Sequence, residues 1–164
     1  MNLRAWLGAA AVAVVAIPAA FVVAPASHAA TLPPGNAAQQ WEKIAEDTAV
    51  GAGAFQGEAF LYLAYVSAAM DGAVNPGERN GQSADAAVAE AAYDVLVHYF
   101  PSQEANLTEL HDAALAAVPD GAAKRNGTMA GGLAAARVLR ERAGDGLQVP
   151  IASTSPFPTL AAGP

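Results

Sequence analysis

The sequence predicts an all-α protein: a bundle of about five helices that follows an N-terminal signal helix and precedes an extended, proline-rich tail. Three observations support this class. Apolar residues recur at helical spacing in five segments, and no segment of useful length shows the alternation of a β-strand. Proline and glycine stand between the periodic segments, where they end helices and form turns. We find no internal repeat.

Residues 1–29 are typical of a secretory signal peptide. Arg4 precedes an apolar run from Ala5 to Val23, and small residues follow the run. Ser27 and Ala29 suit the positions before a signal peptidase cut, so we expect cleavage after Ala29, with cleavage after Ala30 as the neighbouring possibility. We therefore expect a secreted or extracytoplasmic protein. Because the run approaches the roughly 20 apolar residues that span a bilayer, an uncleaved membrane anchor is the alternative.

Residues 30–36 are predicted to be a linker, and residues 37–144 are predicted to form the helical domain. Its first helix is expected from Ala37 to Ala52, with one apolar stripe. The second is expected from Gln56 to Val74 and is apolar almost all round. A helix with so little polar surface favours a central position with neighbours on most sides.

The third helix is expected between Ser83 and Pro101, with Ser83 or Asp85 as its cap. Its apolar residues form one face, so it is interpreted as a packing element. Ser102 is the expected cap of the fourth helix, which has a buried stripe that ends at Val118.

The fifth helix is expected from Ala122 to Ala143, capped by Asp120 and ended by Gly144. It contains Gly127, Gly131 and Gly132, each of which costs up to about 1 kcal/mol against alanine in an exposed helix. Close approach of another helix would explain them, and a break near Gly127 is the alternative. Residues 145–164 carry four prolines among serine and threonine, and they are predicted to be an extended connector or tail.

Composition excludes several kinds of function. The chain has 164 residues and a net charge of −7, and an acidic domain repels phosphate backbones, so we expect no nucleic-acid binding. It has no cysteine, which excludes thiolate nucleophiles, thiolate metal sites and redox switches. The length after signal removal suits one small domain with a single core.

Two histidines remain outside the predicted signal peptide, and neither has the spacing of a metal ligand. His98 stands four residues after Asp94, so we expect a hydrogen bond within the helix. His111 stands beside Asp112 on a polar helix face, where a solvated role is expected.

Other chemistry-bearing residues also have structural explanations. Ser67 is expected to bond back to the preceding helical turn, and no serine stands in a G-x-S-x-G motif. Asp71 is the one acidic residue expected to be partly buried, with a link to the following loop. Glu46 and Asp47 diverge around their helix. We therefore predict no catalytic, cofactor-binding or metal-binding residue in this chain.

Three segments together resemble the N-terminal part of bacterial proteins in the vanadium-dependent haloperoxidase family, within the type 2 phosphatidic acid phosphatase superfamily. They are Leu61 to Asn75 (L-Y-L-A-Y-V-S-A-A-M-D-G-A-V-N), Ser83 to Pro101, and Val118 to Gly146, with P-D-G-A-A-K and R-A-G-D-G. Trp41 with Ile44-Ala45 also matches. The sequence departs from the family pattern in the loop from Pro76 to Gln82 and at Met70-Asp71-Gly72.

The resemblance implies a helical scaffold that continues past a proline-rich connector into a second helical region. That region would hold vanadate or phosphate with a Lys, an Arg-Pro, a P-S-G-H, an Arg and a later His. None of those motifs occurs in this chain, and Lys124 lies outside the region where the family's pocket lysine is expected. The expected partner is thus a missing or separate catalytic half. A homo-oligomer through apolar helix faces is the alternative partner, and no membrane association is expected after signal cleavage.

These patterns leave three hypotheses for function. The first is a scaffold portion that is inactive alone, and it predicts an exposed apolar patch on the second helix, where the missing half would dock. The second is a standalone secreted helical binding or structural module. The third is an independent enzyme with an unrecognised site.

Overall fold

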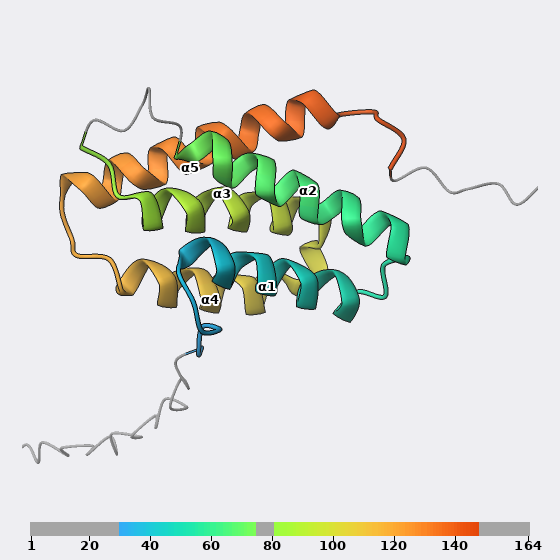
Figure 1. The fold of residues 1–164 in the computed structure, drawn as a ribbon, viewed down its shortest axis with the longest axis horizontal. Helices are drawn as coiled ribbons and strands as arrows, with labels where there is room; N and C mark the ends of the chain where they lie inside the picture. Colours follow the sequence, from blue (N-terminus) through green and yellow to red (C-terminus); the bar gives the residue numbers. More distant parts are fainter. Residues whose placement is uncertain (1–29, 75–80, 148–164) are drawn as a thin grey trace, which may run out of the picture.

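A computed structural model describes residues 30–74 and 81–147, and both the predicted signal peptide and residues 148–164 of the predicted tail lie outside these ranges. Every regular element in the described ranges is helical, which confirms the all-α class (Figure 1). A short 3-10 turn, Pro101–Gln103, precedes the fourth helix. The helices are α1 (Ala37–Gly51), α2 (Gln56–Ala73), α3 (Ala84–Tyr99), α4 (Glu104–Ala116) and α5 (Ala122–Arg142).

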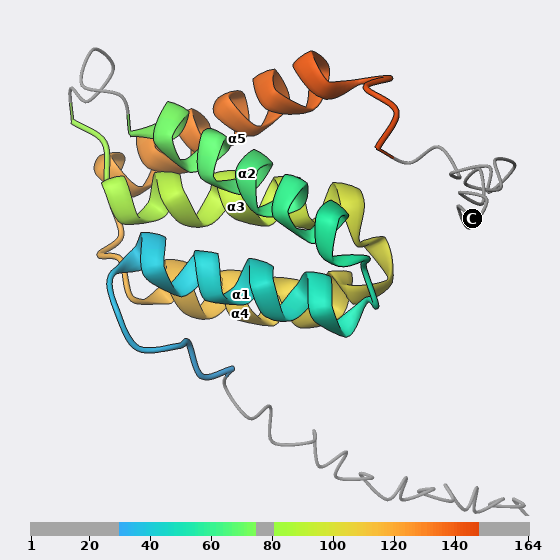
Figure 2. The same ribbon diagram turned by 45° about the vertical axis from the view of Figure 1, so that its right-hand side comes forward.

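The centre of the bundle is α3, which contacts all four other helices. α1 and α4 lie on one side of it, and α2 and α5 lie on the other (Figures 1 and 2). Small side chains on α3 allow this close approach, and they are buried in several directions around its axis. They are Ala86, Ala87, Ala89, Ala91 and Ala92.

The expectation that the second helix is central is therefore wrong. α2 contacts α1, α3 and α5, yet its buried residues lie on one side. Phe60 and Leu61 on the other side are exposed. Because α2 carries large side chains where α3 carries alanine, α2 cannot be approached closely on every side. These two exposed side chains also confirm the prediction that the second helix presents an apolar patch.

Glycines place α5 directly against α3. A Cβ built on Gly131 would lie 2.5 Å from the carbonyl oxygen of Ala87, and one on Gly127 would lie 2.4 Å from that of Ser83. No side chain fits at such distances from backbone atoms, so the predicted close approach of another helix is confirmed. α5 runs unbroken through Gly127, which excludes the predicted alternative.

Two of the predicted caps are wrong and one is right. Ser83 accepts a hydrogen bond from the N–H of Ala86 and caps α3, as expected. Ser102 instead lies inside the 3-10 turn, because Pro101 has no N–H to satisfy and can start that turn. Asp120 lies one residue before the cap position of α5, which Gly121 occupies, and its carboxylate pairs with Lys124 at 3.0 Å.

Each of the helices α1, α2, α3 and α4 contributes large side chains to the core. The largest fully buried ones are Trp41, Leu96, Leu107, Val66 and Val95. Outside the core, no helix in the described ranges is both long enough and apolar enough to cross a membrane.

Candidate functional site

His111 is more tightly packed than the sequence suggested. Its Nε2 lies 2.9 Å from Oε2 of Glu90, and its ring stacks on Tyr93 with the centroids 4.3 Å apart. The ring centroids of His111 and Trp41 lie 6.4 Å apart in an edge-to-face arrangement, and only 12% of the His111 side chain is exposed. The expectation of a solvated His111 is wrong, because the packing of α4 on α3 turns this residue toward a carboxylate 21 positions earlier in the chain.

The His111–Glu90 pair has the groups that proton transfer needs, but the neighbouring hydroxyl groups already have partners. The hydroxyl groups of Tyr93 and Thr108 lie 3.0 Å apart and bond to each other. The indole Nε1 of Trp41 is buried without a hydrogen-bond partner among the described residues. We interpret this cluster as the polar contact that holds α4 to α3.

His98 and Asp94 do not form the hydrogen bond that their spacing suggested. His98 lies exposed on the last turn of α3, where its ring and that of Tyr99 are edge-to-face with their centroids 4.8 Å apart. Asp94 points toward α5 instead and lies near Gly132. Burial raises the pKa of the Asp94 carboxyl, and the nearby Glu90 raises it further, while His111 lowers it.

The remaining sequence candidates also have structural roles. Ser67 Oγ lies 2.9 Å from the carbonyl oxygen of Leu63, as expected, and it also contacts Glu42 of α1. Asp71 is exposed, so its predicted partial burial is wrong. Within the described residues there is no group of three or more His, Cys, Asp or Glu that could hold a metal ion.

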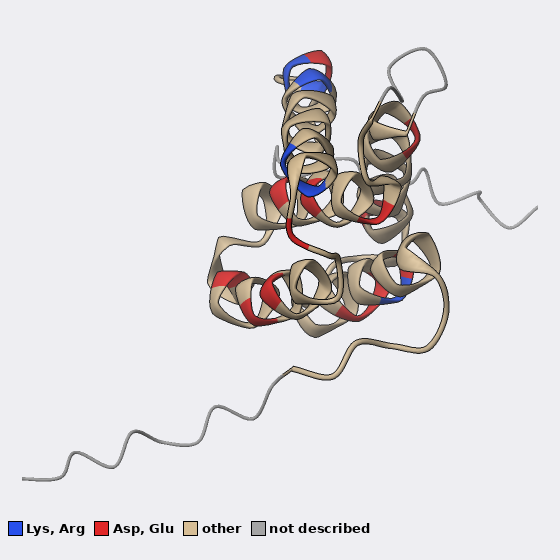
Figure 3. Ribbon diagram, turned by 90° about the vertical axis from the view of Figure 1, so that its left-hand side faces the viewer, with Lys and Arg blue, Asp and Glu red and all other residues tan. Residues whose placement is uncertain are grey.

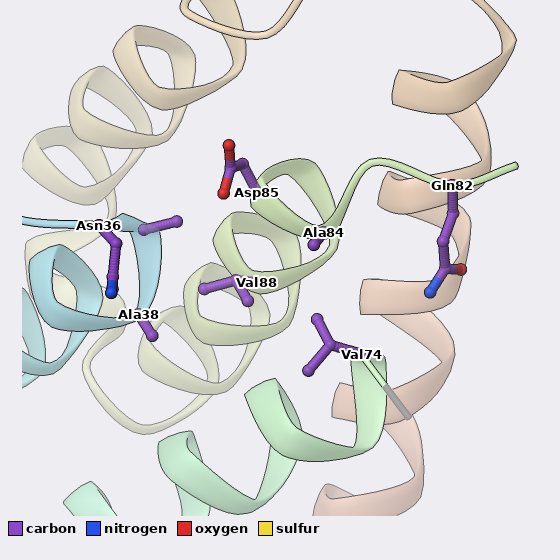
Figure 4. A pocket seen from close by; sticks show the side chains of 8 residues that line it. Asn36, Ala38, Val74, Gln82, Ala84, Asp85 and Val88 are labelled. Atoms are coloured by element: carbon purple, nitrogen blue, oxygen red, sulfur yellow. The ribbon is translucent and has the colours of Figure 1, made fainter. Parts of the chain in front are cut away.

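A hollow of about 470 Å³ lies where the first turns of α1 and α3 meet the end of α2 (Figure 4). Its walls are mostly small apolar side chains with Val74 and Val88. Asn36 accepts a hydrogen bond from the N–H of Gln39, and Gln82 Nε2 donates to the carbonyl oxygen of Ala73 at 3.0 Å. These amides are engaged in holding the helix ends, and Asp85 is the one other polar residue in the described lining. The hollow therefore gives no convergent set of polar groups for a ligand.

A second polar cluster fixes the chain just after α5. The hydroxyl of Tyr65 donates to Oδ2 of Asp145 at 2.5 Å, and the guanidinium of Arg142 lies 5.3 Å from the centre of the Tyr65 ring. Oδ1 of Asp145 accepts a hydrogen bond from the N–H of Leu147 at 3.0 Å. The hydrogen bond to Asp145 raises the pKa of Tyr65 to about 12, and the same bond lowers the pKa of Asp145. We call this set the α5 latch.

Large apolar side chains are uncovered where α1 ends and α2 begins. We call Val50, Phe55, Phe60 and Leu61 the corner patch; their exposed fractions run from 45% to 70%. Next to it a groove of about 320 Å³ is lined by apolar residues of both helices, with Glu46 and Gln56 at its polar positions. The apolar lining consists of Val50, Ala54, Ala59, Phe60 and Leu63. An exposed apolar patch of this kind marks a binding site more often than a catalytic site.

The basic residues do not build an oxyanion pocket. Five of the six in the described ranges lie on α5 (Figure 3). Lys124 pairs with Asp120, Arg137 contacts Glu141 at 3.7 Å, and Arg142 lies over Tyr65. Vanadate or phosphate needs several donors that converge on one point, so the described residues do not fit that group.

The chain matches no protein-family model, no curated protein and no solved structure. The haloperoxidase resemblance therefore rests on the sequence segments quoted above. Among the described residues, the corner patch and its groove are the strongest candidate functional site, and they favour binding over catalysis.

Proposed function

We propose that this chain is the N-terminal helical scaffold of a secreted protein that resembles vanadium-dependent haloperoxidases and acid phosphatases. In this proposal the domain has no activity alone, and it packs against a second helical unit that carries the oxyanion pocket. The observation that carries the proposal is the corner patch, where Phe55, Phe60 and Leu61 face solvent. Burial of a large apolar side chain is worth about 1.5–3 kcal/mol, so a partner that covers this patch would bind with a strong apolar contribution.

The position of the chain after α5 also supports a second unit that covers the corner patch. The α5 latch holds Asp145 against Tyr65 of α2, the helix that carries Phe60 and Leu61 of the corner patch, and Leu147 packs against the core. A second unit that follows residue 147 through a connector would begin close to the patch. Short tethers of this kind raise the effective concentration of the tethered partner to about the millimolar range.

The DNA that follows the coding sequence gives the first test. We expect coding sequence for P-S-G-H and the pocket arginines, in the same frame or in a neighbouring gene. The encoded unit should copurify with this chain, and vanadate-dependent bromide oxidation should require both. A Leu61→Asp variant should lose copurification, while Asp71→Asn, also exposed on α2 but outside the patch, should keep it. If no such coding sequence exists, or if this chain alone oxidises bromide with vanadate and peroxide, the proposal fails.

Secretion is tested separately. Exported protein should begin at Ala30, which N-terminal sequencing or intact mass would show. Retention of residues 1–29 in the membrane fraction would favour the uncleaved anchor instead.

The alternative function is a standalone secreted helical binding or structural module. It is favoured by the core, which is closed around α3 and contains fully buried Trp41, Leu96 and Leu107. A mature protein that is monomeric, melts cooperatively and does not bind a hydrophobic dye would favour this module over the scaffold.

A further inference from the structure

The outer side of α5 carries two large apolar side chains between two arginines. Met129 and Leu133 are exposed, and an arginine stands four residues before the first and four residues after the second. Residues four positions apart lie on one side of a helix, about 6 Å apart along its axis. The glycines of α5 hold its opposite side against α3, so these residues face away from the bundle. We call Arg125, Met129, Leu133 and Arg137 the α5 stripe.

α5 is also the basic helix of the described bundle. It carries five Lys or Arg residues and one Glu, whereas Lys43 is the only Lys or Arg on the other four helices (Figure 3). Each of those four helices has an excess of Asp and Glu over Lys and Arg. An apolar pair with a positive charge at each end favours a partner surface that is both apolar and acidic.

The groove beside the corner patch has both properties. Val50 and Phe60 give it an apolar lining, and Glu46 lies at a polar position with 58% of its side chain exposed. Lys43 lies 3.4 Å from Glu46 and 2.5 Å from Asp47. Because two carboxylates share this one ammonium group, the acidic end of the groove keeps a net negative charge.

The spacing of the charges also matches. Glu46 stands four residues before Val50 on α1, and Arg137 stands four residues after Leu133 on α5. Antiparallel packing of the two helices places Leu133 beside Val50. Arg137 then lies beside Glu46, because a rise of about 6 Å separates the two positions on each helix. α5 and α1 lie on opposite sides of α3, so α5 cannot reach the groove of its own molecule (Figures 1 and 2).

We propose that the α5 stripe of one copy docks in the groove of a second copy. Leu133 then lies against Val50 and Phe60, and Arg137 pairs with an acidic residue of α1. The two surfaces differ, so the contact is head-to-tail and each copy can hold two neighbours. It uses few large side chains, so we expect single copies in dilute solution and assembly at high protein concentration.

This inference goes beyond the proposed function and needs only the present chain. Phe60 belongs to both the groove and the corner patch. A second copy and the second unit would therefore exclude each other.

Sedimentation of the exported chain over a dilution series tests this assembly. We expect the average mass to rise with concentration up to about 1 mM. Leu133→Asp and Phe60→Asp should each keep the chain monomeric, because each removes one of the two surfaces. Ala105→Asp, at an exposed position of α4 outside both surfaces, should assemble like the parent. A monomer mass throughout the series would overturn the proposal.

A mixture of the two monomeric variants shows whether the contact is head-to-tail. Leu133→Asp keeps an intact groove and Phe60→Asp keeps an intact α5 stripe, so an equimolar mixture should form dimers and nothing larger. A mixture that stays monomeric would mean that the two surfaces do not bind each other, and the proposal would be wrong.

A charge exchange tests the pair of Arg137 and Glu46. Arg137→Glu should weaken assembly about threefold to tenfold, and Glu46→Arg in the same chain should restore it. If the double variant assembles no better than Arg137→Glu alone, the proposed pairing is wrong. None of these measurements involves the second unit, so failure here and failure of the scaffold function can be told apart.

Discussion

The two sides of α5 differ in a way that reverses the usual pattern of a surface helix. The side that packs on α3 carries Gly127 and Gly131, whereas the outer side carries Met129 and Leu133, which are 64% and 71% exposed. Small residues are buried here and large apolar residues face solvent. The difference shows that closeness of the backbones, more than hydrophobicity, decides how α5 is oriented.

The largest expected effect comes from truncating one buried leucine of the core and one exposed leucine on the outer side of α5. Leu96→Ala removes a side chain that is 1% exposed in the central helix, and we expect a loss of about 2–5 kcal/mol in the free energy of unfolding. Leu133→Ala should change it by no more than about 0.5 kcal/mol. Urea denaturation measures both. Equal losses would mean that the outer side of α5 is covered in solution.

Neighbouring glycines test the role of backbone closeness. Gly131→Ala places a Cβ against the backbone of Ala87 and Ala91, so we expect a loss of about 1–3 kcal/mol. Gly132→Ala meets only Asp94 Oδ2 at 3.5 Å, an ordinary contact, and should gain up to about 1 kcal/mol from helix propensity. The midpoint temperature of thermal unfolding should therefore fall for Gly131→Ala and rise for Gly132→Ala. If both midpoints moved in the same direction, the close packing of α3 and α5 would be contradicted.

The histidines repeat the comparison for polar residues. His111→Ala removes the stack on Tyr93 and the contact with Glu90, and it should cost about 0.5–1.5 kcal/mol. His98→Ala removes an exposed ring and should stay within about 0.5 kcal/mol of the parent. Denaturant midpoints distinguish the two, and a larger effect at His98 would mean that α4 does not pack on α3 through His111.

The smallest effect concerns the α5 latch and is seen as a titration. The pKa of Tyr65 is raised to about 12, so the latch contributes stability below pH 10 that is lost as pH rises from 10 to about 12. Because the pKa of Asp145 is lowered beneath its usual 3.8, the carboxylate's contribution is present above that pH and is lost as pH falls below it. Tyrosinate absorbance should show one late-titrating phenol, and Asp145→Asn should return its pKa toward 10. An unchanged titration would exclude the Tyr65–Asp145 bond.

Local features were predictable from the sequence and long-range contacts were not. The five helices begin and end within about two residues of their predicted positions, because proline and glycine act on their own neighbours. The Ser83 cap and the Ser67 back-bond were predictable for the same reason. The His111–Glu90 pair joins positions 21 apart and the Tyr65–Asp145 bond joins positions 80 apart, so both depend on how the helices pack.

The sequence predicted that an apolar surface would be exposed, but not which residues form the candidate site. An apolar second helix implied an exposed patch, but the groove also needs Val50 and Glu46 from α1. The wrong prediction of the central helix also came from long-range packing. Hydrophobicity favoured α2 as the central helix, but the small alanine side chains of α3 allow the four other helices to approach α3 instead.

The central position of α3 has a consequence for how the protein opens. Every other helix contacts α3, so α3 cannot leave its place without separating the whole bundle. Its backbone amides should therefore exchange with solvent deuterium only through global unfolding, at the slowest rate in the molecule. Amides of α4, which has its main contacts with α3 and only Leu107 fully buried, should exchange earlier through local opening.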